Sequence, residues 1–343
     1  AASSIEQQDY RSARIHLLTA LRENAQDPEA NFMFAKVLIE LGDAAGAEAA
    51  LKKLTGNTAY AERIQPLIGR VLLLKGQNED ALALTESPAG EVTTQLHAIN
   101  AMALFGMGRT DEAESVLAEA LQAAPGNAEL LWIQGNRDLE IGDIDSATRS
   151  TSLALEAGPN SMEALMLAGR LALAKADGKK ALRYFAKVRE VRPDNLVAEY
   201  MRGAVYRNLG ERREARKCFE TVLSSAPDHP LATYFLAQMD YEDGKSDKAY
   251  QRLQSSKADM DAVPQALRLA GLLEFRRGSY EQTIKKLNRY LAQNNGDGDA
   301  LVILARALSA AGNDGEAFRV IAPLARLSIA PEDALKRAAQ LAA

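Results

Sequence analysis

Residues 196–229 read LVAEYMRGAVYRNLGERREARKCFETVLSSAPDH, and the spacing within this stretch recurs along the chain. Gly203 is followed by Gly210 seven residues later, then by Ala215 and Phe219. A small residue occupies the position of Gly203 at intervals of 34 residues, with one interval of 32: Ala1, Ala35, Gly69, Ala101, Gly135, Gly169, Gly203, Ala237, Gly271, Ala305 and Ala339. A repeat of this length is typical of solenoids of helical hairpins, in which each unit contacts only its neighbours.

A glycine seven residues after the small residue is expected to end the first helix of each hairpin, because glycine adopts the left-handed conformation that helix C-termini prefer. These turn glycines are Gly42, Gly76, Gly108, Gly142, Gly210, Gly244, Gly278 and Gly312. In one unit we expect the turn glycine two residues later, in Asp177-Gly178. Asp43, Asp143 and Asn313 are expected to cap the helix that follows.

The second helix of each unit is expected to bury one face, because a small residue is followed four positions later by a large apolar one. The small residues are Ala13, Ala47, Ala81, Ala113, Ala147, Ala181, Ala215, Ala249, Thr283 and Ala317. The large ones are Leu17, Leu51, Leu117, Phe185, Phe219, Leu253, Leu287 and Ile321. Pro125, Pro159, Pro193 and Pro227 then fall where proline would stop this helix. Each unit is therefore predicted to be helix, tight turn, helix, loop.

This order of small residue, turn glycine, alanine, large apolar residue and proline resembles the tetratricopeptide repeat (TPR). The resemblance covers the whole chain and implies an all-α fold, an α-solenoid of hairpins in a right-handed superhelix. We interpret 1–343 as a single array and as a fragment of a longer one, because its ends fall inside hairpins. The expected units are a partial repeat at 1–27, complete repeats at 28–61, 62–93, 94–127, 128–161, 162–195, 196–229, 230–263, 264–297 and 298–331, and a partial repeat at 332–343.

Four short segments also resemble the long TPR lipoproteins that accompany bacterial exosortase (PEP-CTERM) and exopolysaccharide systems. They are QDYRSA at 8–13, LGDAAGAE at 41–48, APDHPLA at 226–232 and YLAQN at 290–294. The resemblance implies a scaffold in the bacterial periplasm, associated with the outer membrane, although the lipidated cysteine of such a protein is not in this chain. A cytoplasmic location is the alternative.

Composition excludes several classes of function. The net charge of -5 argues against nucleic acid as a partner, because phosphate binding requires a concentrated basic surface. Cys218 is the one cysteine, so an intramolecular disulfide and a cysteine-rich zinc site are excluded. The sequence has no run of about 18 apolar residues, the length that a membrane-spanning helix needs, so we expect no span in this chain.

In a solenoid of this kind the first helices are expected to line the concave face, with positions three before and one after the small residue pointing into the groove. The first of these columns is Phe32, Pro66, Ala98, Trp132, Met166, Tyr200, Tyr234, Arg268 and Val302. The second is Lys36, Arg70, Met102, Asn136, Arg170, Ala204, Gln238, Leu272 and Arg306. Aromatic residues beside convergent hydrogen-bond donors are typical of a peptide or sugar site.

We therefore predict a concave ligand-binding groove in which no residue is catalytic. Its predicted residues are Phe32, Lys36, Arg70, Trp132, Asn136, Met166, Arg170, Tyr200, Arg207, Tyr234, Gln238 and Tyr241. The alternative is that Trp132, Met166, Tyr200 and Tyr234 fill gaps between hairpins.

The residue types that carry catalysis are scattered. His16, His97 and His229 fall in different units, and Cys218 is expected to be a small buried residue rather than a nucleophile. The oxygen-rich segment at 294–299 is better explained as a loop between hairpins than as a calcium site. The sequence predicts no metal, no cofactor and no enzymatic activity.

Three functions remain open at this point. The first is a non-catalytic scaffold that holds a protein or peptide partner in its groove, within a bacterial envelope system for assembly or export of exopolysaccharide or sorted surface proteins. The second is direct binding of an anionic polysaccharide along Arg70, Arg170, Arg207 and Arg306. The third is a regulatory region of a larger enzyme. We adopt the first as our hypothesis.

Overall fold

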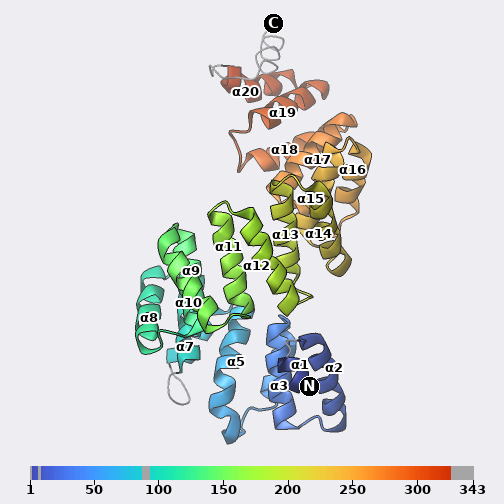
Figure 1. Ribbon diagram of the computed structural model, residues 1–343. Coiled ribbons are helices and arrows are strands. Elements are labelled where there is room, and N and C mark those ends of the chain that lie inside the picture. Colours follow the sequence, from blue (N-terminus) through green and yellow to red (C-terminus); the bar gives the residue numbers. More distant parts are fainter. Residues whose placement is uncertain (1, 7–8, 87–92, 326–343) are drawn as a thin grey trace. The chain divides into compact units, whose positions relative to one another are not determined.

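The computed structural model describes residues 2–6, 9–86 and 93–325, which fold into consecutive helical hairpins (Figure 1). This confirms the predicted all-α fold. The helices are α1 (Ala2–Glu6), α2 (Tyr10–Glu23), α3 (Pro28–Glu40), α4 (Ala44–Lys52), α5 (Ala61–Leu74), α6 (Asn78–Glu86), α7 (Thr94–Gly106), α8 (Thr110–Ala123), α9 (Ala128–Ile141), α10 (Ile144–Ala157), α11 (Met162–Ala174), α12 (Gly178–Val191), α13 (Leu196–Asn208), α14 (Arg212–Ser225), α15 (Pro230–Glu242), α16 (Ser246–Ser255), α17 (Pro264–Arg276), α18 (Tyr280–Leu291), α19 (Gly298–Ala310) and α20 (Asp314–Ala325).

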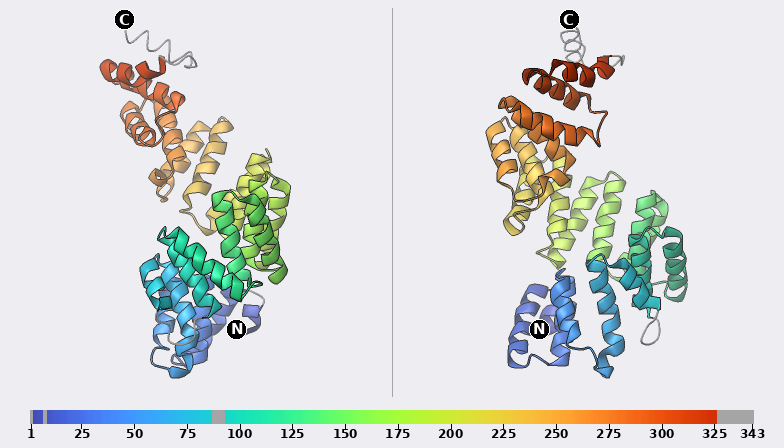
Figure 2. Two further views of the ribbon diagram at one scale, coloured as in Figure 1. Left: turned by 90° about the vertical axis from the view of Figure 1, so that its left-hand side faces the viewer. Right: turned by 180° about the vertical axis from the view of Figure 1, so that it is seen from behind.

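The chain divides into two compact units, Ala1–Ala198 (unit 1) and Glu199–Ala343 (unit 2). In unit 1 the first helices α3, α5, α7, α9 and α11 each contact the next, and each also packs against its own second helix (Figure 2). In unit 2 the same relation joins α15, α17 and α19. The expected partial repeat at 332–343 and the small residues Ala1 and Ala339 lie outside the described residues.

The core follows the predicted columns. Every small residue of the second helices, from Ala13 to Ala317, has no exposed surface. The large residues four positions later are all buried as well. The glycines of the first helices face large neighbours: a Cβ added to Gly169 would lie 2.4 Å from the Phe185 ring, and one added to Gly135 would lie 2.6 Å from Leu167. The recurring small residue is therefore a contact point between helices.

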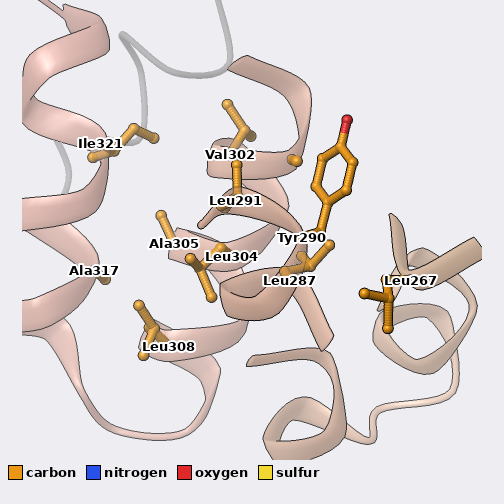
Figure 3. Packing of buried hydrophobic residues seen from close by; sticks show 11 residues of the cluster. Leu267, Leu287, Tyr290, Leu291, Val302, Leu304, Ala305, Leu308, Ala317 and Ile321 are labelled. Atoms are coloured by element: carbon orange, nitrogen blue, oxygen red, sulfur yellow. The ribbon is translucent and has the colours of Figure 1, made fainter. Parts of the chain in front are cut away.

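Figure 3 shows this packing at the end of unit 2. Leu304, Ala305 and Leu308 of α19 lie between Leu287 and Leu291 of α18 on one side and Ala317 and Ile321 of α20 on the other. Tyr290 joins the same cluster through its ring, while its hydroxyl donates a hydrogen bond of 2.9 Å to Asp297. One apolar cluster thus connects the hairpins α17–α18 and α19–α20.

The turns follow the predicted register with one correction. All eight predicted turn glycines have φ between 71° and 83°. The expectation of a turn at Gly178 was wrong, because Ala176 takes the left-handed position with φ 57° and Gly178 begins α12. Asp177 caps α12 instead, its side chain accepting a hydrogen bond of 2.9 Å from the Lys180 backbone N–H. The seven-residue spacing is kept even where glycine is missing.

The predicted caps at Asp43 and Asp143 are confirmed, since each side chain accepts a backbone N–H three residues later. Pro125, Pro159, Pro193 and Pro227 lie in the loops after α8, α10, α12 and α14, as expected.

Buried acidic side chains occupy some core positions of the first helices. Asp240 of α15 has no exposed surface, and its carboxylate lies 2.8 Å from Arg216 of α14 and 3.1 Å from Arg252 of α16. Lys248 of α16 lies 3.8 Å away. A charge buried in this way requires its partners, because an unpaired charge in the interior is strongly destabilising. Asp240 therefore ties the hairpin α15–α16 to the preceding helix.

Ala176→Gly is expected to stabilise the protein by about 1 kcal/mol, because an L-residue with a Cβ is strained in the left-handed region. Urea denaturation of the full chain measures the change. Gly210→Ala, at the equivalent turn where an added Cβ meets nothing within 4 Å, is the reciprocal control and should destabilise by a similar amount. A lower urea midpoint for Ala176→Gly would contradict the assignment of strain.

Asp240→Asn is expected to destabilise unit 2 by about 2 kcal/mol, less than for a fully buried pair because Arg216 and Arg252 are partly exposed. Asp247→Asn is the matched control, since Asp247 pairs with Arg277 on the surface and exposed pairs contribute little. Thermal denaturation of both variants measures the difference, and equal melting temperatures would show that the buried network is not stabilising.

Candidate functional site

Unit 1 contains a cavity of about 570 Å³. Its lining comes almost wholly from the first helices α3, α5, α7, α9 and α11, which are the helices expected to form the concave face. We call it the unit 1 cavity and define it by Tyr10, Ile39, Glu40, Arg70, Leu73, Leu74, Met102, Ala128, Glu129, Trp132, Ser161, Met162, Glu163 and Arg192.

Two ion pairs span the unit 1 cavity. Arg70 of α5 lies 2.6 Å from the carboxylate of Glu129 at the start of α9, so it connects two hairpins that are not adjacent in sequence. Arg192, just after α12, lies 3.3 Å from the Glu40 carboxylate and donates a hydrogen bond of 2.8 Å to the Glu40 backbone carbonyl. Both guanidinium groups of the lining are therefore engaged by the protein itself.

Arg192 brings the first and last hairpins of unit 1 together. Its guanidinium lies 4.8 Å from the centre of the Tyr10 ring on α2, a cation–π distance. Close by, Arg11 of α2 pairs with Asp194 at 2.8 Å. These contacts join residues more than 150 positions apart in sequence, so the hairpins of unit 1 curve far enough for the two ends of its inner face to meet.

The electrostatics of the unit 1 cavity are set by three carboxylates facing two guanidinium groups. Burial raises the pKa of Glu40, and the charge of Glu163 raises it further, against the opposing effect of Arg192 and Arg70. Burial also raises the pKa of Glu129, and there too the charge of Glu163 acts against Arg70. Glu163 is thus close enough to influence both of the other carboxylates.

Trp132 and its neighbours form the apolar wall. The Trp132 side chain is half-buried and packs against the cluster formed by Ala98, Ala101, Leu117 and Ile133. It also borders a second cavity of about 290 Å³ together with Asn136 and Arg170. The Asn136 side chain donates a hydrogen bond of 2.9 Å to the Trp132 carbonyl and accepts one from Arg170. Three of the predicted groove residues, Trp132, Asn136 and Arg170, therefore gather with Arg70 at α5, α9 and α11.

The other predicted residues of unit 1 lie apart from this group. Phe32 packs 5.7 Å from Tyr60, with the Arg63 guanidinium 4.3 Å from its ring centre and the exposed Lys36 ammonium at 5.9 Å. Met166 is half-buried on α11.

In unit 2 the predicted residues are half-buried around an aromatic cluster. Tyr200 lies 5.3 Å from His229 and 6.2 Å from Phe235, measured between ring centres, and Tyr234 lies 5.2 Å from Phe235. Arg207 stacks 5.2 Å from the Phe235 ring. Burial raises the pKa of both Tyr200 and Tyr234.

Tyr241 and Gln238 complete the predicted set. Arg276 lies over the Tyr241 ring at 4.8 Å. The side-chain oxygen of Gln238 is shielded from solvent and accepts no hydrogen bond within the part of the chain that the structure describes.

One expectation about the groove columns needs correction. Pro66, Ala98 and Val302 are buried, so the position three before the small residue packs against a neighbouring helix in some units rather than facing the groove. Two of the predicted arginines lie beside carboxylates, since Arg70 pairs with Glu129 and Arg207 lies 3.9 Å from Glu242. The residues one after the small position are half-buried or exposed in every described unit.

The sequence analysis did not predict the three acidic residues of the unit 1 cavity or Arg192. Glu129 and Glu163 each lie six residues before a small residue, and their separation of 34 is a signal that could have found them. Glu40 and Arg192 carry no such signal, since their contact depends on the curvature of unit 1.

Two of the residues considered for catalysis, Cys218 and His229, have structural roles. Cys218 is buried as predicted, and burial, together with Glu199, raises its pKa to about 12, so it is not a nucleophile at neutral pH. His229 caps α15 by accepting the Ala232 backbone N–H at 3.2 Å. Residues 294–297 precede α19, and Asp297 caps that helix and pairs with Arg268 at 2.6 Å. The loop interpretation is confirmed for 294–297, whereas Gly298 and Asp299 are the first residues of α19.

Among the described residues, no three His, Cys, Asp or Glu side chains are arranged as ligands of one metal ion, so the carboxylates of the unit 1 cavity are not grouped as a metal site. Within the same residues, no helix has both the length and the apolar character needed to cross a bilayer.

Comparison with known proteins identifies the repeats. A family model described as tetratricopeptide repeat matches residues 4–71 and 172–239, and a second model of the same description matches 100–147, together more than half of the chain. No catalytic domain is among these matches. Comparison with curated proteins found no match.

Several solved structures are similar to this chain. A chain in the crystal structure of the APC/C hetero-tetramer Cut9–Hcn1 is 14% identical, with a TM-score of 0.64 over 92% of this chain and 63% of that one. A tetratricopeptide repeat protein from Parabacteroides merdae is 17% identical, with a TM-score of 0.49 over 82% of this chain and 99% of that one. PilW, a type IV pilus biogenesis factor, is 17% identical, with a TM-score of 0.43 over 72% and 99% of the two chains.

This chain spans 63% of the length of the Cut9–Hcn1 chain, and at 14% identity that likeness concerns the fold alone. The family matches and the consecutive hairpins agree with each other. The chain is a tetratricopeptide repeat protein.

Proposed function

We propose that this protein is a non-catalytic scaffold that binds a segment of a partner protein on the inner face of unit 1. The observation that carries the proposal is the unit 1 cavity, to which five successive first helices contribute side chains. TPR proteins typically bind peptide partners, and the cavity offers such a partner both a hydrophobic anchor point and charged groups.

The size and composition of the unit 1 cavity support this function. A volume of about 570 Å³ falls within the range of roughly 300–1,000 Å³ that is usual for ligand sites. Trp132 supplies the kind of large, partly exposed aromatic ring that dominates binding energy at protein interfaces. Met102 and Met162 add flexible apolar surface that adapts to different partners.

The charges favour a protein partner over an anionic polysaccharide. In the unit 1 cavity, Arg70 is paired with Glu129 and Arg192 with Glu40. A polyanion in this cavity would have to displace these carboxylates and would also approach Glu163. The polysaccharide alternative is therefore the weaker one for the unit 1 cavity.

We also propose, on the resemblance of the segments at 8–13, 41–48, 226–232 and 290–294 to envelope TPR lipoproteins, that the partner belongs to a bacterial envelope system for exopolysaccharide or surface-protein export. Location in the periplasm, at the outer membrane, is part of this proposal. Fractionation of the source cells with an antibody against this chain tests it, and recovery in the cytosolic fraction would contradict it.

Site-specific photo-crosslinking tests the scaffold function. The photoreactive residue p-benzoylphenylalanine is introduced at Met102, which lines the unit 1 cavity, or at Leu153, which is exposed on the second helix α10. In source cells the Met102 position should crosslink a discrete protein, and Leu153 should not. Trp132→Ala should reduce the Met102 crosslink about tenfold or more, as loss of an aromatic anchor does.

As a control, the circular dichroism spectrum of each variant is compared with that of the unmodified protein and should show the same fold. Equal crosslinking from Met102 and Leu153, or a Met102 crosslink that Trp132→Ala leaves unchanged, would place binding away from the unit 1 cavity. Crosslinking to glycan instead of protein would favour the polysaccharide alternative.

A further inference from the structure

We propose that the unit 1 cavity recognises a lysine or arginine side chain of the partner segment. This inference rests on the proposed scaffold function and names the chemistry of its partner. The occupant is a cationic side chain presented by an extended stretch of protein, placed between Glu163 and the Trp132 ring.

The first argument is the charge balance. Within the unit 1 cavity, Glu129 is paired with Arg70 and Glu40 with Arg192. Glu163 forms no ion pair within the described residues, and its carboxylate accepts a hydrogen bond of 3.0 Å from the neutral Ser161 hydroxyl. The cavity therefore has one negative charge more than its own cations balance, and a single positive charge would balance it.

The second argument is the position of Glu163. Its charge acts on both Glu40 and Glu129, whose pKa values are raised mainly by burial and further by this neighbour. Three carboxylates that influence one another across a partly desolvated space repel, and a cation placed among them relieves the repulsion.

The third argument is the aromatic wall. Several arginines of this protein lie over aromatic rings, and the Tyr10 ring of the cavity is covered by Arg192 in this way. Trp132 is half-buried and has no such cation over it among the described residues. Because Trp provides the strongest cation–π surface of the natural side chains, the half-buried Trp132 ring that lines the cavity suits a guanidinium or ammonium group.

The charges of the unit 1 cavity differ from those of a site for acidic peptides, because unpaired basic side chains would line such a site. They also differ from a metal site, since the three carboxylates are not grouped around one point. A lysine or arginine side chain suits the unit 1 cavity in two ways. Its charge balances that of Glu163, and its long apolar stem can lie along Met102 and Met162.

The chain contains a built-in reporter for this test, because Trp132 is its one tryptophan. Titration of the full protein with the blocked tripeptide acetyl-Ala-Arg-Ala-amide should give a saturable change in Trp132 fluorescence. The lysine tripeptide should behave similarly, while the glutamine tripeptide, at the same ionic strength, should bind at least tenfold more weakly.

Glu163→Gln should weaken binding of the arginine tripeptide roughly tenfold or more, as expected when a charged hydrogen bond is lost. Glu156→Gln is the matched control, because it removes the same charge from an exposed position on α10 and should leave binding unchanged. Glu163→Lys, which supplies a cation from the chain itself, should abolish binding while circular dichroism shows an intact fold.

Equal affinity for the arginine and glutamine tripeptides, or equal effects of Glu163→Gln and Glu156→Gln, would overturn the proposal. The two proposals fail separately. If Met102 crosslinks a protein but the arginine tripeptide does not bind, the scaffold function stands and the cationic specificity is wrong. If the tripeptide binds but Met102 crosslinks no protein, the cavity takes cations and the scaffold function is wrong.

Discussion

Close approach of neighbouring helices at one small residue in each first helix is the constraint on which the rest of the structure depends. At Gly169 there is no room for even a methyl group, because an added Cβ would lie 2.4 Å from the Phe185 ring. Gly203 and Gly271 meet Phe219 and Leu287 in the same way. Since the large partner also recurs every 34 residues, each hairpin repeats the geometry of the one before, and first helices pack on first helices.

This repetition places side chains of unit 1 that are distant in sequence around one cavity. Arg70 and Glu129 meet across two hairpins, and Arg192 reaches back to Glu40. These pairs neutralise most of the charge in the unit 1 cavity while Glu163 is left without a cation among the described residues. These ion pairs depend on the curvature of unit 1, because the same residues on a straight array would not face one another.

The periodic features could be predicted from sequence, and the exceptions to the period could not. Small and large columns were predictable because core packing repeats with the chain. Ala176 shows the limit of such prediction, since this turn keeps its register although it has no glycine at the left-handed position.

The buried acidic residues are a second exception to the period. The position three after the small residue carries Leu38, Leu104 and Leu308 in some units but Asp138, Asp240 and Glu274, all buried, in others. Whether an acid can be buried there depends on partners such as Arg216, which come from other helices. The contact of Arg192 with Glu40 depends on the curvature added by each hairpin, which no local pattern specifies.

A double-mutant cycle on Gly169 and Phe185 tests the central constraint most directly, with urea denaturation of the full chain as the measurement. Gly169→Val should cost about 3 kcal/mol by overpacking, and Phe185→Ala about 3–4 kcal/mol by leaving a cavity. If the two residues share one space, the double variant should be more stable than the sum of the single losses by over about 1 kcal/mol, because the valine fills part of the space that the ring leaves. Losses that add within about 0.5 kcal/mol would contradict the account.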